Sequence, residues 1–324
     1  MKKFLTVLLL LISVGSLAAC QYESDTIVIG EGDWQSNQFY NQVAKYIIEE
    51  GYDNKVDVTV VDTPLLIQSL TDGSIQVNVE TWSDNMPTYQ SDIAAGNYTQ
   101  IGVNFSDNYQ GIYIPQYLAD EYDIEYIVDL VDHKELFADP EISNWNAETD
   151  KAVVYGGPSG WQVTEFLINK FTNTELYPEL AANFELRPLE SSALLDATLI
   201  DAYESSEPWV GYNWEPTAIM GTLDMVLLKD YFDYDITTGA GNMPTNDVTI
   251  VVTSGFQADY PEISEFLSKY ATSSQVASDA LSYMTENDMT ATETAKWWLS
   301  ENSDMWSLWV TADAKAKILA VLEL

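Results

Sequence analysis

The chain has 324 residues, 46% of them hydrophobic and 12% aromatic, which suffices for the core of one large α/β unit or two domains. Acidic residues outnumber basic ones by 51 to 13, giving a formal net charge of −38. Such a chain lacks the clustered lysine and arginine that nucleic acids require, and it has no basic stripe to attract anionic lipid.

The first residues have the pattern of a targeting segment, so residues 1–19 are predicted to be a signal peptide. Lys2 and Lys3 precede an apolar stretch that is too short for a stable membrane span. The stretch ends in Leu17-Ala18-Ala19-Cys20, which resembles a bacterial lipobox and predicts cleavage before Cys20 and lipid on its sulfur. Cys20 is the only cysteine, which excludes a disulfide framework and a cysteine zinc site. We therefore expect an extracytoplasmic protein, anchored to the cell membrane by lipid on Cys20.

Strand and helix patterns alternate in the first part of the mature chain. In order, they predict a strand at 26–29, a helix from Ser36 to Gly51, a strand at 56–60, a helix at 63–70 and a strand at 75–79. This order indicates a parallel sheet covered by helices, and ligands of such sheets bind beyond the carboxyl ends of the strands. Trp34 follows the first strand, and Glu80 and Trp82 follow the third.

Further elements continue to the C-terminus. They are an extended crossover at 110–115, a polar helical region at 116–150, a strand at 151–155, a helix after Glu165, a strand over 208–214, a strand at 225–228, a loop at 231–246 and a strand at 248–252 that returns to the first sheet. From Pro261 the pattern is helical.

The turn at 155–165 joins a strand to a helix through three glycines and a proline. A helix that begins there directs free amides and the positive end of its dipole into the turn, which suits a carboxylate. The π-face of Trp161 in the same turn suits a cation. The turn therefore offers a contact to each end of a zwitterion.

The ten tryptophans fall into different classes. Trp82, Trp161 and Trp214 each follow a strand or lie in a Gly/Pro turn, where aromatic side chains tend to face a cleft, and Trp34 is similar. Packing inside the protein remains the alternative for all four. The tryptophans of the C-terminal helical region, in contrast, are expected to pack that region against a lobe: Trp297, Trp298, Trp306 and Trp309.

An enzyme is the rival class of function. His133 is the sole histidine and lies in a polar segment, so the sequence offers neither a Ser-His-Asp set nor a multi-histidine metal site. A carboxylate pair for glycoside hydrolysis stays open, although no spacing singles one out. A structural surface lipoprotein is a third alternative. We expect no catalytic residue, no metal and no cofactor.

At the residues that follow the strands, the sequence resembles the substrate-binding proteins of ABC-type glycine betaine/proline betaine importers. The matching pieces occur in the same order and spacing from about residue 27 to residue 310: Glu80-Thr81-Trp82, Gln110-Gly111-Ile112-Tyr113, Gly157-Pro158-Ser159-Gly160-Trp161 and Tyr212-Asn213-Trp214-Glu215-Pro216. The resemblance implies a periplasmic-binding-protein fold, type II-like, with two α/β lobes, two crossovers and a ligand cleft between them. Lobe one would comprise 21–113 plus 246–324, and lobe two 114–245.

The resemblance also implies a site. Trp82, Trp161 and Trp214 would box a quaternary ammonium group, and the backbone amides of Gln162 and Val163 would hold a carboxylate. Trp34, which has no counterpart across the family, would add a fourth wall or change which methylated amine fits. The paired cysteines that flank this turn in some members are absent here.

The implied partners are a small quaternary amine and an ABC permease in the membrane, with the receptor itself a monomer. Choline, carnitine and trimethylamine oxide remain alternatives to glycine betaine, and Asp33 or Glu80 would then serve a hydroxyl group or a cation. The acidic surface has two open interpretations, adaptation to salty water and steering of cationic ligands.

Overall fold

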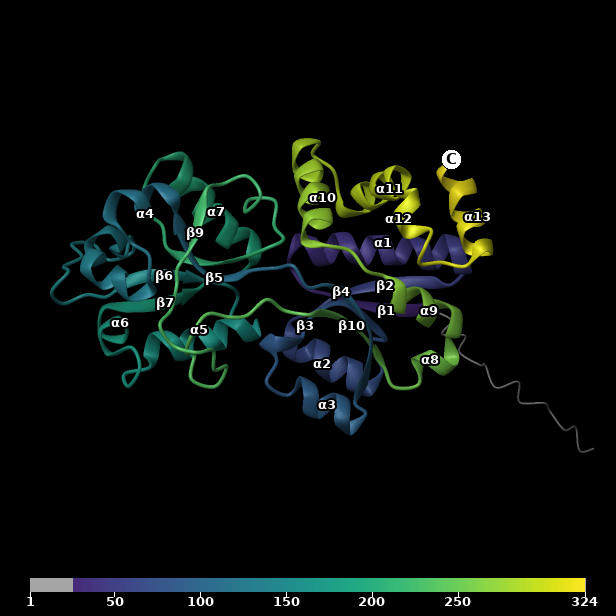
Figure 1. Ribbon diagram of the computed structural model, residues 1–324, viewed down its shortest axis with the longest axis horizontal. Helices are drawn as coiled ribbons and strands as arrows, with labels where there is room; N and C mark the ends of the chain where they lie inside the picture. The colour runs from purple at the N-terminus through teal and green to yellow at the C-terminus, as the bar shows by residue number, and fades with distance from the viewer. Residues whose placement is uncertain (1–25, 324) are drawn as a thin grey trace, which may run out of the picture.

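The computed structural model describes residues 26–323, which form two α/β lobes side by side (Figure 1). Each lobe contains one five-stranded sheet, and two crossover segments connect the lobes. The predicted signal peptide and Cys20 lie outside the described residues. Among the described residues, no helix has the length and apolar character needed to span a membrane.

Lobe one carries the sheet of order β2-β1-β3-β10-β4. Its strands are β1 (Thr26–Glu31), β2 (Lys55–Val60), β3 (Val77–Trp82), β4 (Tyr98–Phe105) and β10 (Val248–Thr253). β1 is parallel to β2 and β3, whereas β10 is antiparallel to β3 and β4. The predicted return of residues 248–252 to the first sheet is confirmed, and this strand lies inside the sheet rather than at its edge.

Helices cover the two faces of this sheet unequally (Figure 1). On one face lies the long helix α1 (Gln35–Tyr52), which contacts α9 (Pro261–Lys269), α10 (Ser274–Glu286), α11 (Ala291–Glu301) and α13 (Ala312–Leu322). The short helices α8 (Phe256–Asp259) and α12 (Ser303–Trp306) contact α9 and α11, respectively. Trp298, Trp306 and Trp309 are buried in this core and Trp297 packs against it, so the packing role predicted for them is confirmed.

The other face of the sheet carries two short helices, α2 (Thr63–Asp72) and α3 (Tyr89–Ala95), and the single turn η1 (Ser83–Asn85) follows β3 in the chain. The sequence sets both ends of α2. The Asp62 side chain accepts a hydrogen bond from the Leu65 amide at the N-terminus, and Gly73 ends the helix with φ +81°, a conformation in which glycine is favoured.

Lobe two carries the sheet of order β7-β6-β8-β5-β9. Its strands are β5 (Gln110–Pro115), β6 (Ala152–Gly156), β7 (Phe184–Pro188), β8 (Gly211–Trp214) and β9 (Met225–Leu227). Its helices are α4 (Gln116–Tyr122), the 3-10 segment η2 (Ile127–Phe137), α5 (Gln162–Thr172), α6 (Pro178–Asn183) and α7 (Ser192–Glu204).

The structure corrects the expected role of residues 110–115. They form β5, between β8 and β9 in the sheet of lobe two, so the expected boundary after Tyr113 falls inside a strand of that lobe. All six residues of β5 are buried, as in a strand whose sheet is covered on both faces. The sequence pattern of such a short run does not distinguish a buried strand from an extended connecting segment. The first crossover therefore precedes Gln110.

The two crossovers are hydrogen-bonded to each other. Asn108 lies between β4 and β5, and Asn246 lies between β9 and β10. The Asn108 side chain donates to the Asn246 carbonyl oxygen (2.7 Å) and accepts from its amide (2.9 Å). Both residues are fully buried, so this pair joins the two connections at the hinge between the lobes.

Candidate functional site

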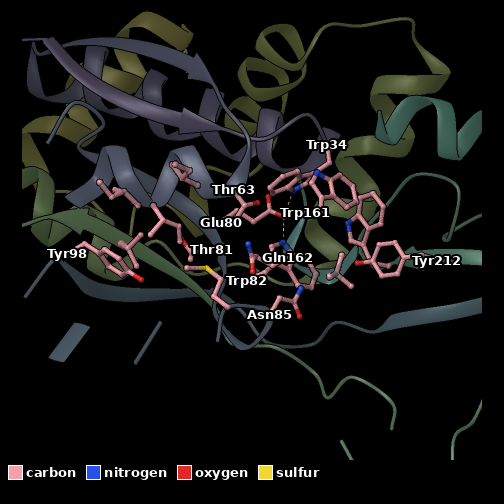
Figure 2. A pocket seen from close by; sticks show the side chains of 17 residues that line it. Trp34, Thr63, Glu80, Thr81, Trp82, Asn85, Tyr98, Trp161, Gln162 and Tyr212 are labelled. Carbon is pink, nitrogen blue, oxygen red and sulfur yellow. Dashed lines mark hydrogen bonds between the residues drawn. The ribbon is translucent and has the colours of Figure 1, made fainter. Parts of the chain in front are cut away.

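One cavity lies where the carboxyl ends of strands from both lobes meet (Figure 2). All six residues predicted for the site line it: Trp34, Trp82, Trp161, Gln162, Val163 and Trp214. Trp34 and Trp82 come from lobe one and the other four from lobe two. The cavity contains about 660 Å³ of empty space, including the part open to solvent.

The local structure explains why these tryptophans reach the cavity. Trp82 is the last residue of β3 and Trp214 the last of β8, while Trp34 and Trp161 precede the first residues of α1 and α5. Each therefore lies at the carboxyl end of a strand or in the loop that follows it, the edge where α/β sheets bind ligands.

Adjacent indole rings stand nearly at right angles. The ring centroid of Trp161 is 5.6 Å from that of Trp34 at an interplanar angle of 81°, and 5.1 Å from that of Trp214 at 85°. Two indole rings at right angles can form adjacent walls around a ligand. Gly157 makes room for this arrangement, since a Cβ on it would lie 2.6 Å from the Trp161 ring.

Tyr212 belongs to the same aromatic group and was not predicted. Its ring stacks on Trp214 at 5.7 Å and 17°, and it also lines the cavity. Its hydroxyl donates to Gln110 Oε1 (3.1 Å), and Gln110 exchanges two hydrogen bonds with Asn85 of lobe one. Tyr212 and Trp214 are two residues apart on one strand and so face the same side, which is the signal that identifies Tyr212.

Glu80 is the buried carboxyl group of the site, with 1% of its surface exposed. Its Oε1 atom accepts hydrogen bonds from Trp34 Nε1 (2.8 Å), Ser36 Oγ (2.9 Å) and Trp82 Nε1 (3.1 Å). Its Oε2 atom has no hydrogen-bond partner among the described residues. Burial raises the pKa of Glu80 to about 7, although hydrogen bonding by Trp34, Ser36, Trp82 and Asn37 opposes this shift. The carboxyl group thus fixes two indole rings and keeps one free oxygen.

The N-terminus of α5 opens onto the same cavity. Gln162 and Val163 are the first residues of this helix, where backbone N–H groups have no partner within the helix. The Thr164 amide, in contrast, already bonds to the Trp161 carbonyl oxygen (3.1 Å). Two amides beside three indole rings therefore form a group that can bind an anion next to a group that can bind a cation.

Asp33 connects the two lobes beside the cavity. Its carboxylate accepts hydrogen bonds from Trp161 Nε1 (3.1 Å) and the Ser192 amide (3.0 Å), both in lobe two. Asp196, one turn further along α7, has a pKa raised to about 7 by burial and by the nearby charge of Asp33. Asp33 thus holds the lobes together rather than facing a ligand, and Asp33 does not line the cavity.

No group of three or more His, Cys, Asp or Glu side chains among the described residues is arranged to hold a metal ion. His133 packs against Tyr122 in lobe two, with ring centroids 5.3 Å apart, and does not line the cavity.

Comparison with known proteins shows which family and which solved structures the chain resembles. Residues 25–301 match the family described as the substrate-binding domain of ABC-type glycine betaine transport systems. The chain is similar to an ABC-transporter choline-binding protein in complex with choline, with 20% identity and a TM-score of 0.74 over 92% of this chain and 98% of that one.

Two further solved structures are similar. One is a glycine betaine/L-proline-binding protein from Borrelia burgdorferi, with 18% identity, a TM-score of 0.72 and coverage of 90% of this chain and 99% of that one. The other is a lactococcal protein in its closed conformation with glycine betaine, with 18% identity, a TM-score of 0.69 and coverage of 88% and 99%. The predicted type II-like periplasmic-binding-protein fold is thereby confirmed.

Proposed function

Because the chain belongs to the family of substrate-binding domains of ABC-type glycine betaine transport systems, we propose that it binds glycine betaine in the cavity between its lobes and delivers it to a membrane permease. The family resemblance predicted from the sequence is confirmed, and with it the role of substrate-binding receptor. The observation that carries the choice of ligand is the group of perpendicular indole rings beside the free amides of α5.

The magnitudes of the contacts support a zwitterion. A desolvated cation–π contact contributes roughly 2 kcal/mol, so three rings give about 6 kcal/mol. Micromolar affinity needs about 8 kcal/mol net of the cost of immobilising the ligand and closing the lobes. Two charge-assisted hydrogen bonds from the Gln162 and Val163 amides, at about 1.5–3 kcal/mol each, supply the difference. A ligand with a carboxylate uses both parts of the cavity.

A ligand without a carboxylate is the second candidate, and Glu80 favours it. Choline carries one net positive charge, and the free Oε2 atom of Glu80 can accept its hydroxyl hydrogen bond and balance its charge. Carnitine and trimethylamine oxide fall between these cases. A thermal-shift panel of the four amines separates them, since the ligand with the highest affinity raises the melting temperature most at equal concentration.

We expect Trp161→Ala to weaken glycine betaine binding at least about tenfold, because it removes one wall of the box. Titration calorimetry measures the change. Trp145→Ala is the matched control, because Trp145 lies outside the cavity and its indole N–H donates to the Lys151 carbonyl oxygen. Unchanged affinity in Trp161→Ala would remove that ring from the ligand site.

We also propose that the protein works outside the cytoplasm, as a monomer anchored by lipid on Cys20, with residues 1–19 removed. The support is the order of basic residues, apolar stretch and Leu17-Ala18-Ala19-Cys20 in the sequence. Partition of the wild-type protein into a detergent phase, and of the Cys20→Ser variant into the aqueous phase, is the expected result. Equal partition of the two proteins would exclude the anchor.

A further inference from the structure

Glu80 is the only side chain with a formal charge among the described residues that line the cavity. The rest of the lining is aromatic, aliphatic or neutral polar. Figure 2 shows Glu80 beside the indole rings, to two of which it is hydrogen-bonded. An ammonium group that enters the rings therefore meets one anionic group in the lining, and it meets this group only when Glu80 is ionised.

The surroundings of Glu80 supply no positive charge. Among the described residues, no lysine or arginine is one of the groups that shift its pKa, and its hydrogen-bond donors are neutral side chains. Tyr40 of α1 and Tyr270 after α9 are the phenols that face it, and burial raises the pKa of both well above the usual value, so both are uncharged.

The other elements around Glu80 add no cation either. At the end of β1, Glu31 accepts a hydrogen bond from Asn41 of α1, and burial raises its pKa as well. The neighbouring strand β10 has no ionisable residue. Across the cavity, the lining residues from lobe two are all neutral. A bound ligand is therefore the available source of a counter-charge for Glu80.

Burial without a counter-ion makes the charge of Glu80 sensitive to what enters the cavity. Oε1 accepts three hydrogen bonds, whereas Oε2 has no partner among the described residues. Such a carboxyl group favours its protonated form, and its pKa is about 7. A cation nearby favours the ionised form. Binding of a cation and loss of the Glu80 proton are therefore linked.

The two candidate classes of ligand act differently on this acid. Choline has one net positive charge, and nothing within the ligand offsets it. Glycine betaine also carries a carboxylate, which the proposed amide site of α5 would hold in the same cavity. Its negative charge offsets much of the effect of the ammonium group on Glu80. A zwitterion therefore changes the proton affinity of Glu80 less than a cation does.

We propose that Glu80 determines the net charge of the ligand that the receptor selects, because binding of a cationic methylated amine expels its proton to solvent and binding of a zwitterionic amine does not. With Glu80 protonated, the cavity lining is neutral and prefers glycine betaine. With Glu80 ionised, the lining carries one negative charge and accepts choline. This inference rests on the proposed function, because it uses the same cavity and the same ammonium site.

Titration calorimetry of choline and glycine betaine at pH 5.5 and pH 8 tests the proposal. The ionised form of Glu80 is present above its pKa of about 7 and is lost below it. Choline affinity should therefore be at least about tenfold higher at pH 8 than at pH 5.5, and glycine betaine affinity should change by no more than about threefold. Salt at about 1 M screens the acidic protein surface, since the Debye length is then about 3 Å, whereas it screens a buried charge much less.

The expelled proton can be counted directly. Calorimetry in buffers of different ionisation enthalpy measures how many protons each binding event releases. Near pH 6.5, choline binding should release most of one proton per protein molecule, and glycine betaine binding should release much less.

Two carboxyl variants identify the titrating group. Glu80→Gln keeps an oxygen for the three hydrogen bonds but cannot ionise, so its ratio of choline to glycine betaine affinity should equal the wild-type ratio at pH 5.5 at both pH values. The ratio cancels any effect of pH that both ligands share. Asp196→Asn is the matched control, because Asp196 also has a pKa of about 7 but does not line the cavity. This variant should keep the wild-type pH dependence.

Ser36→Ala provides the test if Glu80→Gln does not fold. The Ser36 hydroxyl donates to Glu80 Oε1 (2.9 Å) and lowers the pKa of the carboxyl group. Its removal should move the midpoint of the choline pH profile to higher pH. An unmoved midpoint would exclude Glu80 as the titrating group.

The results separate the two proposals. If glycine betaine binds but choline does not bind at pH 8, or the ratio of the two affinities is the same at both pH values, Glu80 does not select ligand charge and the proposed function stands. Loss of the pH dependence in Asp196→Asn, or its persistence in Glu80→Gln, also overturns the assignment to Glu80. A protein that binds neither amine at either pH overturns both proposals.

Discussion

The buried side chain of Glu80 supports the indole rings of the site but destabilises the folded protein when it is ionised. Its Oε1 atom accepts hydrogen bonds from the indole N–H groups of Trp34 and Trp82, and burial raises the pKa of its carboxyl group to about 7. A carboxyl group with a pKa above its unfolded value of about 4.5 stabilises the protein when protonated at low pH. That contribution is lost as the pH rises toward and past 7.

We therefore compare the change that Glu80→Gln causes in the free energy of unfolding of the ligand-free protein at two pH values. We expect this change to be more stabilising at pH 8 than at pH 4.5, by up to about 3 kcal/mol. The glutamine oxygen can still accept the three hydrogen bonds, but it carries no buried charge. Urea denaturation at both pH values measures the difference. Glu135→Gln, at an exposed glutamate, is the control. A Glu80→Gln effect that is equal at both pH values would show that folding does not raise the pKa of Glu80.

The sequence predicted the tryptophans of the site because their positions follow from strands. A residue at the carboxyl end of a parallel strand faces the binding edge wherever the strand lies in the sheet. Tyr212 and the Asp33–Ser192 contact were not predicted, because they depend on the pairing of β8 and on how the lobes meet. Asp33 and Glu80 were alternative candidates for a ligand without a carboxylate, and the structure places Asp33 outside the cavity, bonded to the other lobe.

At the scale of elements, the N-terminus of α5 is the place where we propose that the ligand carboxylate binds. A side-chain substitution tests it poorly, since the donors are backbone amides. Proline at Gln162 removes one amide without breaking the helix, because proline is favoured at the first helical position. Trp161 already has the extended conformation that a residue before proline adopts, with φ −85° and ψ 137°.

We expect Gln162→Pro to weaken glycine betaine binding at least about tenfold, the loss of one charge-assisted hydrogen bond. Gln162→Ala, which keeps the amide, should retain the wild-type affinity within about threefold. Calorimetric titration of both variants gives the comparison. Equal losses in the two variants would assign the effect to the side chain and would exclude the amide as a carboxylate donor.

Most strands and helices could be predicted because their apolar periodicity is local, as in α1 and β2. β5 was mistaken for a crossover because a short apolar run does not reveal which sheet it joins. Its neighbours, β8 and β9, lie about a hundred residues further along the chain.

At the scale of the whole molecule, aromatic side chains from both lobes meet at one cavity. Trp34 of lobe one meets Trp161 of lobe two, and Asp33 bonds to the first residue of α7. The Asn108–Asn246 pair joins the two crossover segments where they pass between the lobes. The two-lobe architecture was predicted through the family resemblance, whereas periodicity alone indicated only an α/β sheet.

The position of β10 has a consequence for how the molecule forms on the ribosome. β10 separates β3 from β4, yet it is made after the whole of lobe two. The earlier strands of lobe one therefore lack the strand between β3 and β4 while more than a hundred further residues are synthesised. Lobe two, in contrast, is contiguous in the chain and can fold as a unit. A nascent chain arrested before Val248 should hold a finished second lobe beside an incomplete first one.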